Sequence, residues 1–431
     1  MRPPPVATTA PDRRGSASGT GDSGPGTSDP VEFAALRNAT VLQILPSLAE
    51  ADARAAVRIA GALVDAGARA IVAARPGPLL RELRALGGRW VPLAETGFGP
   101  FALPFSRRRN RRILADLIAA EQVDLIHALT PASAMLAEPP RAAAGLLLTS
   151  MGRTANESRL PWRERAQRRH AAAFSHRLIA SSIFDAAAVI REQDLDPDRL
   201  VVVPRSVDTR RFDPAAAAGR VASLRNAWRV PPADRLILVP GRVAAWNGQH
   251  VALDAFRILL DRGLRGATLV IAGETDSEPA YVRALHRQIR ALELDHVVRV
   301  AGHCADMPAA MAAAHVVAVT ALEAPRHGRT SAEAQAMGRP VVTSAAGALP
   351  EHLVAPPRIA ADLRTGWVVR PGDPDDLAEA LAAPLALDPT AYDALSARAH
   401  QFADYMFSPA STDLATLAVY AAMLETQVLD R

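Results

Sequence analysis

Residues 40–48 read TVLQILPSL, a short apolar run that closes with a proline and a serine. Such a run is typical of a strand buried on both faces, followed by its exit loop. Residues 53–66 then repeat apolar side chains at helical spacing, and Gly67 follows them as a helix C-cap would. The next apolar run, ARAIVAA at 68–74, predicts a second strand. A strand, a helix and a strand in this order form a βαβ unit, so this stretch predicts a parallel sheet.

The same alternation continues along the whole chain. Further strands are predicted at 89–93, 123–129, 145–150, 176–182 and 200–208. After a Pro/Ala-rich stretch the pattern restarts, with strands predicted at 235–243, 267–274, 296–303, 315–321, 339–347 and 366–373. The predicted fold class is therefore α/β, with two Rossmann-like, doubly wound parallel sheets. Ligands of such sheets bind beyond the carboxyl ends of the strands, so we expect the site in a cleft between two facing domains.

Five segments follow from these patterns. Residues 1–38 are rich in Pro, Gly and Ser and are expected to be a disordered tail. Residues 39–212 form the predicted first domain, 213–234 a linker, and 235–400 the second domain. Residues 390–424 are expected to be helical with a break at Ser408–Pro409, and the helices of the segment 401–431 are expected to pack back toward the first domain.

Composition excludes several chemistries. The 431 residues carry 49 Lys plus Arg against 45 Asp plus Glu, a net charge of +4, and the sequence contains no lysine at all. A Schiff-base, pyridoxal-phosphate or P-loop lysine is therefore excluded. The single cysteine, Cys304, excludes an internal disulfide and a cysteine-based zinc site and fits the cytoplasm. No run reaches the ~20 apolar residues of a membrane span.

Five motifs, in order, resemble a known family. They are LPSL at 45–48, PRSVDTRRFDP at 204–214, PGRVAAWNGQH at 240–250, GHCADMPAAM at 302–311, and the block 323–351 followed by TGWVVRPGD. The ordered set resembles the family-four (group 1) retaining glycosyltransferases of the GT-B fold. That resemblance implies metal-independent transfer of a sugar from a nucleotide sugar, bound mainly by the second domain. It implies a glycan or lipid-linked acceptor on the first domain, as in the synthesis of cell-envelope polysaccharide.

The resemblance also implies a donor site in the second half of the chain. Its residues are Gly241, Arg242, Asn247, Glu323, Gly328, Arg329, Thr330 and Glu333. An arginine in a glycine turn can hold a diphosphate as a bidentate donor, although a surface arginine is the plain alternative. Glu333 matches the family's ribose-binding carboxylate, and the helix start at 328–331 offers backbone N–H groups to a phosphate or is simply capped. Glu323 is equally well explained as a solvated loop carboxylate.

Four positions depart from the family pattern. Asn247 stands where the family has a lysine, Pro325 where it has a glutamate, and Gly152 where it often has a histidine. The loop 49–52 reads AEAD and lacks the family's Gly-Gly pair. All four fall on the donor side, so no residue is assigned a catalytic role. The alternative hypothesis is a catalytically degenerate homologue that binds a nucleotide sugar or serves as a scaffolding partner.

Other features have plainer interpretations. His127 is expected to be structural or to face the cleft. Asp194 and Asp196 have the spacing of a metal-binding D-x-D motif but favour a turn, and Asp373 with Pro374 predicts a helix N-cap. The basic runs RRRNRR at 107–112 and RERAQRR at 163–169 have two interpretations. They are solvated helix faces, or they contact anionic lipid headgroups at the inner face of the membrane or the phosphate of an acceptor. Nucleic acid is not expected as a partner, because aromatic residues make up only 4% of the chain.

Overall fold

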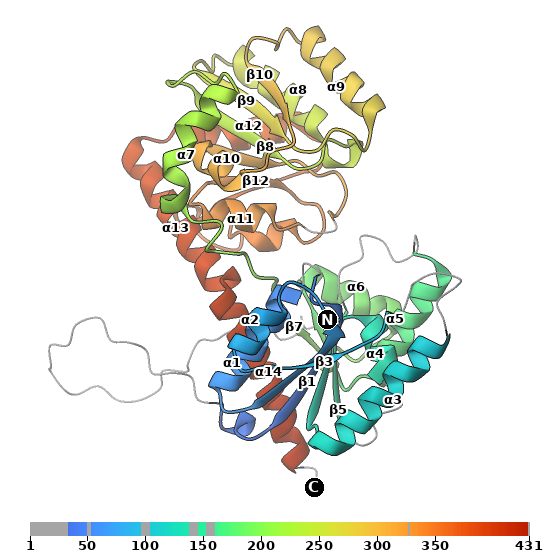
Figure 1. Cartoon of the computed structure of the whole chain (residues 1–431). Coiled ribbons are helices and arrows are strands. Elements are labelled where there is room, and N and C mark those ends of the chain that lie inside the picture. The colour runs from blue at the N-terminus through green and yellow to red at the C-terminus, as the bar shows by residue number, and fades with distance from the viewer. Residues whose placement is uncertain are drawn as a thin grey trace, which may run out of the picture. The chain divides into compact units, whose positions relative to one another are not determined.

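The computed structural model describes residues 33–49, 53–95, 104–137, 145–151, 160–325 and 328–429. These residues form two compact units, each built on its own parallel sheet (Figure 1). None of the helices in these ranges combines the length with the hydropathy that a bilayer span requires.

The first unit contains a seven-stranded sheet in the order β3-β2-β1-β4-β5-β6-β7. Its strands are β1 Thr40–Ser47, β2 Arg69–Arg75, β3 Arg89–Pro92, β4 Leu125–Ala128, β5 Leu146–Ser150, β6 Arg177–Ala180 and β7 Leu200–Val202. Its helices are α1 Ala53–Asp65, α2 Leu80–Ala85, α3 Pro104–Glu121, α4 Pro131–Ala137, α5 Trp162–Phe174, α6 Ile183–Gln193 and α14 Pro409–Leu429, with short 3-10 turns at Ala34–Leu36 and Pro197–Arg199.

Strand β1 shows why helices must cover both faces of this sheet. Val41 and Leu45 point to the core that contains residues of α1 and α14, whereas Leu42 and Ile44 point to the core that contains residues of α3 and α4. Successive side chains of a strand alternate between faces, so a continuous apolar run needs cover on each side.

The second unit repeats the plan with six strands in the order β10-β9-β8-β11-β12-β13. The strands are β8 Arg235–Pro240, β9 Ala267–Ala272, β10 Val298–Gly302, β11 Val316–Val319, β12 Val341–Ser344 and β13 Gly366–Val369. The helices are α7 Pro214–Ala227, α8 Gln249–Asp261, α9 Pro279–Ala291, α10 Met307–Ala313, α11 Thr330–Ala336, α12 Pro374–Leu385 and α13 Pro389–Phe407, with 3-10 turns at Ala245–Asn247, Leu349–His352 and Ala361–Leu363. One face packs on α8, α9 and α12, and the other on α7, α10, α11 and α13.

All thirteen predicted strands are present, so the prediction of two doubly wound parallel sheets is confirmed. Both strand orders reverse direction at one point, between β1 and β4 and between β8 and β11. This reversal is the topological switch point at which open α/β sheets bind their ligands.

Three predicted boundaries differ from the structure. Residues 33–38 belong to the first unit rather than to a tail, because Leu36 is fully buried in its core. Residues 213–234 are no linker: α7 packs on α10, and Ala217 and Val230 are buried in the second unit. The first unit ends at Pro204 and resumes at Ala410, so residues 401–409 stay with the second unit. Pro/Ala-rich composition resembles a linker, but small apolar side chains also pack closely in a helix.

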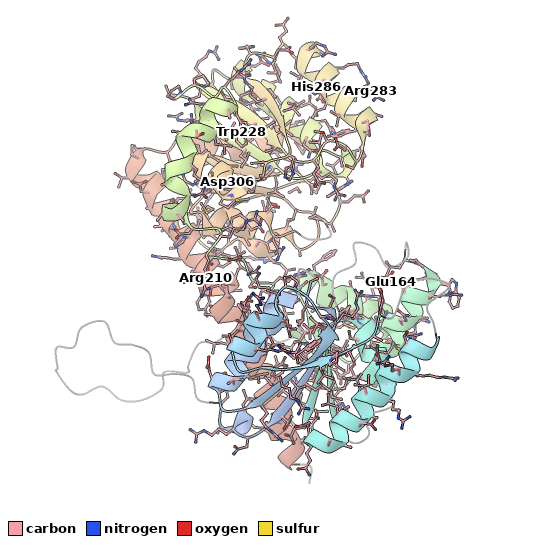
Figure 2. All side chains as sticks on the ribbon, viewed as in Figure 1. Glu164, Arg210, Trp228, Arg283, His286 and Asp306 are labelled. Carbon is pink, nitrogen blue, oxygen red and sulfur yellow. The ribbon has the colours of Figure 1, made fainter. Side chains whose placement is uncertain are left out.

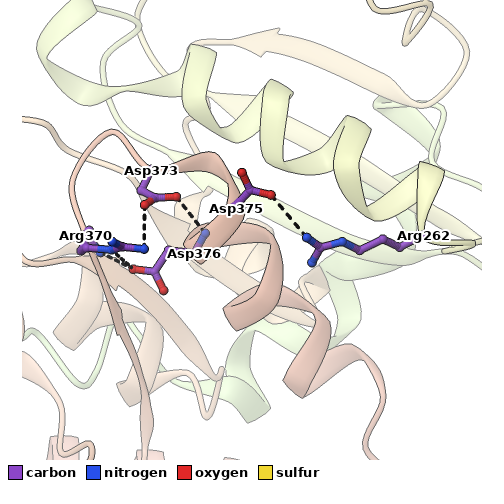
Figure 3. Close-up of polar contacts among 5 residues, drawn as sticks. All are labelled: Arg262, Arg370, Asp373, Asp375 and Asp376. Atoms are coloured by element: carbon purple, nitrogen blue, oxygen red, sulfur yellow. Dashed lines mark hydrogen bonds and ion pairs between the residues drawn. The ribbon is translucent and has the colours of Figure 1, made fainter.

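The predicted cap of α12 is confirmed (Figure 3). The Asp373 carboxylate accepts a hydrogen bond from the Asp376 backbone N–H at 3.0 Å, and Pro374 occupies the first turn. Arg370 pairs with Asp373 at 2.8 Å and with Asp376 at 3.3 Å. Arg262 contacts Asp375 at 3.3 Å on the other side of the helix start. Five charged side chains thus cluster around the cap, and the first-turn acids complement the helix dipole.

Candidate donor site in the second unit

Two loops leave the switch point of the second sheet. The β8 loop, residues 241–248, follows the carboxyl end of β8. The β11 loop, of which residues 320–325 and 328–329 are described, follows β11. Because β8 and β11 are paired neighbours, the two loops emerge side by side. Gly241, Arg242 and Asn247 lie on the first, and Glu323, Gly328 and Arg329 lie on the second, with Thr330 and Glu333 in the helix that follows.

Glycines make the backbone conformation of the β8 loop possible. Gly241 has a φ of 123°, and Gly248 has a φ of 66°, conformations that disfavour other residues. A Cβ on Gly248 would lie 2.2 Å from the Thr320 carbonyl oxygen, and a Cβ on Gly273 would lie 1.9 Å from the Gly241 carbonyl oxygen. Only glycine fits at these two approaches, so the loop sits tightly against its neighbours.

Side-chain amides then fix the backbone of Arg242. Its carbonyl oxygen accepts hydrogen bonds from Asn247 Nδ2 at 2.7 Å and from Gln249 Nε2 at 2.8 Å. The Asn247 carbonyl in turn accepts from the Thr320 hydroxyl at 2.8 Å, which joins the β8 loop to the β11 loop. Asn247 was expected to offer its amide to a phosphate, but here that amide closes the loop on itself.

A second set of residues, which no motif in the sequence indicates, supports this loop. Gln249, the first residue of α8, accepts a hydrogen bond from the Tyr281 hydroxyl at 3.3 Å. The Glu278 carboxylate accepts from the Ala245 N–H at 3.0 Å. Burial raises the pKa of Tyr281, so its hydroxyl stays protonated and remains a donor. The only signal in the sequence was the polar pair Asn247 and Gln249 next to a glycine, without an indication of their partners.

The Arg242 guanidinium is available to a ligand. Its side chain is 54% exposed, and its nearest acid is Glu274, whose carboxylate oxygen lies 3.8 Å from Nε. The Glu274 side chain is itself 61% exposed. A contact of this length between exposed groups contributes little stability, so a phosphate can replace it at small cost.

Glu333 occupies a more enclosed position in the first turn of α11. Its side chain is 20% exposed, and its carboxylate lies 4.0 Å from Arg329 Nε. Burial raises the pKa of Glu333, and the charges of Arg329 and Arg211 oppose that rise. Arg211 thus acts on this carboxylate through its charge, although it was not predicted to be a site residue. No hydrogen bond or ion pair joins Arg242 to Glu333 in the described part of the chain.

The remaining predicted residues have simpler surroundings. Glu323 is exposed on the β11 loop, while Pro325, Gly328 and Thr330 are partly buried. The helix start offers no side-chain cap: Arg329 occupies the cap position without accepting a hydrogen bond there. Gly152 and the acidic loop at 50–52 lie outside the described residues.

His127 in the first unit is structural, one of the two roles expected for it. It is buried in β4, where Nδ1 lies 2.6 Å from the Tyr420 hydroxyl and Nε2 lies 2.8 Å from the Ser150 hydroxyl. Burial lowers the pKa of His127 to about 3, so the ring is neutral at physiological pH. The D-x-D spacing is also a turn, as expected: Asp194 has a left-handed φ of 50° and the Asp196 carboxylate caps the next turn.

Comparison with known families agrees with this architecture. Residues 53–211 match the family described as Glycosyltransferase Family 4, and residues 234–386 match the family described as Glycosyl transferases group 1. The two segments fall one on each unit. The chain therefore has the GT-B fold, and each of its units contains a segment that is similar to a glycosyltransferase family.

Several known glycosyltransferases are similar to parts of the chain. The D-inositol 3-phosphate glycosyltransferase of Kineococcus radiotolerans is 32% identical over 264 residues, which cover 59% of each chain. The enzyme of the same name from Xylanimonas cellulosilytica is 35% identical over 188 residues, 41% of this chain and 42% of the relative. The chain thus matches at most about three fifths of the length of these two relatives.

Solved structures extend the similarity to nearly the whole fold. A glycosyltransferase from Rickettsia africae has a TM-score of 0.71 at 22% identity and covers 90% of this chain and 99% of its own. Anabaena HepE in complex with UDP and glucose has a TM-score of 0.64 at 21% identity, covering 89% of this chain and 100% of its own. At these identities the similarity establishes the fold.

Proposed function

We propose that the chain is a retaining glycosyltransferase that takes its sugar from a nucleoside diphosphate sugar and needs no metal ion. The observation that carries the proposal is the pair of interlocked loops at the switch point, with the exposed Arg242 guanidinium on one and Glu333 beside the other. The complexes of Anabaena HepE with UDP and UDP-glucose support the choice of ligand, and UDP is therefore the first nucleotide to test.

The charge on these residues suits the proposed reaction. When the bond between sugar and diphosphate breaks, negative charge grows on the phosphate oxygens. The Arg242 guanidinium can donate two parallel hydrogen bonds to those oxygens and so stabilise the leaving group. Its backbone is already held by Asn247 and Gln249, so the arginine starts from a fixed position. Retention at the anomeric carbon and independence of metal enter the proposal from the family resemblance.

Glu333 would hold the ribose of the nucleotide. A carboxylate accepts hydrogen bonds from two neighbouring hydroxyls, which is the geometry a ribose offers. Its partial burial raises its pKa, while Arg329 and Arg211 favour the ionised form that accepts both bonds. We propose that the acceptor is a glycan or lipid-linked molecule and that the reaction takes place in the cytoplasm.

Calorimetric titration with UDP, GDP and their glucose conjugates tests the donor site. Arg242→Gln should weaken binding about ten- to a hundredfold, since hydrogen bonds to charged groups contribute roughly 1.5–3 kcal/mol. Arg262→Gln is the matched control, because Arg262 lies in the same unit with a side chain 53% exposed. Absence of nucleotide binding by the unmodified chain, or an equal loss in both variants, would contradict the proposal.

The alternative function is a degenerate homologue that binds the nucleotide sugar without transferring it. Two observations favour it: Asn247 replaces a family lysine and is bound to its own loop, and Pro325 replaces a family glutamate. Pro325→Glu leaves the Asn247 hydrogen bond intact and is therefore tested before the double variant with Asn247→Lys. If transfer by these variants rises many-fold while their affinity for the donor is unchanged, the result would favour the degenerate homologue. Efficient turnover by the unmodified chain would exclude it.

A further inference from the structure

Two basic helices lie on the same face of the first sheet. Leu114 of α3, Ala134 of α4 and Ala171 of α5 share one core, so all three helices cover that face. Helix α4 packs against both of its neighbours, and Arg111 of α3 donates a hydrogen bond to the Met135 carbonyl at 2.9 Å. Helices α3 and α5 therefore flank α4 on the same face of the sheet.

The topology brings the basic ends of these helices to one edge. Helix α3 connects β3 to β4, and α5 connects β5 to β6, so each begins beyond the carboxyl end of a strand. Residues 107–112 lie in the N-terminal half of α3, and residues 163–169 begin at the second residue of α5 and end one residue past its midpoint. Both basic runs therefore lie near the carboxyl edge of the sheet, which is the edge that binds ligands in folds of this class.

Six arginines of these runs are exposed and carry unbalanced charge, whereas Arg107 and Arg111 are half-buried and Arg168 is buried. The exposed ones are Arg108, Arg109, Arg112, Arg163, Arg165 and Arg169. None of the six forms an ion pair with a described acid, although at the other end of α3 Glu121 pairs with Arg69 and Arg89. Glu164 is the one acidic residue within the two runs, and it too is exposed (Figure 2). Arginines elsewhere are paired more often, as Arg58 is with Asp413.

An exposed tryptophan adjoins this charge. Trp162, the first residue of α5, has 68% of its surface exposed, the largest value among the large apolar side chains that the structure describes. The Arg163 guanidinium lies over its ring, 5.3 Å from the centroid. Tryptophan is enriched where one end of the ring is apolar and the other wet, as at a membrane–water interface.

We propose that these six arginines and Trp162, the basic face, dock on an anionic phospholipid bilayer, with Trp162 at the level of the headgroups. The charges are spread over two helices, which suits a surface of many headgroups better than one bound phosphate. Docking would also bring the carboxyl edge of the first sheet to the bilayer, where a lipid-linked acceptor resides. This last step alone rests on the proposed function.

Vesicle flotation with the full chain tests the basic face. The probes are vesicles of phosphatidylcholine alone and of phosphatidylcholine mixed with phosphatidylglycerol. Each basic side chain near an anionic surface strengthens binding about fivefold, so Arg108→Gln/Arg109→Gln/Arg112→Gln should weaken binding to the mixed vesicles on the order of a hundredfold. The control is Arg283→Gln/Arg287→Gln/Arg290→Gln, three exposed arginines of α9 in the second unit, which removes the same charge.

The expected result is binding to the mixed vesicles only. Salt should weaken this binding, the α3 variant should weaken it by the factor given above, and the α9 control should keep it. Trp162→Ser should weaken binding further and remove a blue shift in tryptophan fluorescence. Equal binding by the α3 variant and its control, no binding to the mixed vesicles, or stronger binding to single-stranded DNA than to vesicles would overturn the proposal. UDP affinity, measured in the same variants, is expected to be unchanged, so a failure of docking is distinguishable from a failure of the donor site.

Discussion

Arg242 and Glu333, the two charged residues that the proposal uses, differ in how far they are exposed to solvent. Arg242 keeps its charge at the surface, loosely paired with Glu274 at 3.8 Å, and can turn to a ligand at small cost. Glu333 is largely buried, and burial of a carboxylate without a full set of partners is unfavourable. Such a cost at a site of ligand binding is expected, because stability and function compete there.

The variant Glu333→Gln distinguishes the cost of burying this carboxylate from its contribution to ligand binding. Because burial raises the pKa of Glu333, its ionisation at neutral pH lowers the stability of the folded chain. The variant should therefore melt at a higher temperature than the unmodified chain at pH 7, with the difference disappearing below the usual pKa of glutamate. Its affinity for UDP should fall about tenfold, since a charged acceptor is lost. Thermal melts with and without UDP measure both, and unchanged UDP affinity would exclude the ribose contact.

His127 makes the free energy of unfolding depend on pH with a sign opposite to that of Glu333. Burial lowers its pKa to about 3 from 6.5, so between these values the unfolded chain binds a proton that the folded chain does not. The free energy of unfolding therefore falls as the pH is lowered from 6.5. Between pH 7 and 5 this loss amounts to about 2 kcal/mol, and His127→Asn should abolish it. Urea unfolding at both pH values tests this, and His286→Asn, an exposed histidine, should leave the dependence unchanged.

At the scale of elements, local chemistry decides where helices begin. Asp213, Asp306, Asp373 and Asp388 each cap the helix that follows, and in each case a proline lies in the first turn. The aspartate side chain accepts a hydrogen bond from one free N–H group of the first turn, and the proline, which has no N–H, removes another. Helix α11 differs: it begins after Arg329 without a side-chain cap, and the site residue Glu333 lies in its first turn.

Asp373→Ala tests the cap of α12. The loss of its hydrogen bond to the Asp376 N–H should lower the free energy of unfolding by about 1 kcal/mol. Asp375→Ala is the control, because Asp375 is two residues away and contacts only the exposed Arg262 in the described structure. An exposed pair of this kind contributes roughly 0–1 kcal/mol, so the control should stay close to the unmodified chain. Equal destabilisation in chemical denaturation would show that charge, not the cap, matters here.

At the scale of the molecule, the chain closes its first unit with its last helix. Tyr420 of α14 is fully buried in the first core, and its hydroxyl contacts His127, which lies 293 positions earlier. Arg58 of α1 and Asp413 of α14 pair at 3.0 Å beside it. The first unit therefore cannot be completed until the second unit has been synthesised.

Tyr420→Ala tests this closure. The cavity and the lost contacts should destabilise the first unit by about 3–5 kcal/mol, as for other large buried aromatic residues. Hydrogen exchange should speed up in the strands β1–β7, while β8–β13 keep their protection, because each unit has its own core. Tyr405→Ala of α13, with Tyr405 52% exposed, is the matched control. Loss of protection in both units would show that they unfold as one.

The sequence alone determined the order of strands and helices along the chain, the cap at Asp373 and the turn at Asp194 and Asp196, and it predicted the loops on which a donor site would lie. These depend on apolar periodicity and on hydrogen bonds between residues a few positions apart, which are visible in one stretch of chain. Only the tertiary structure decided that Asn247 closes the Arg242 loop, that Tyr281 and Gln249 support it, and that α7 is no linker. Such contacts join residues that packing alone brings together, and no local pattern encodes which partner a buried polar group will find.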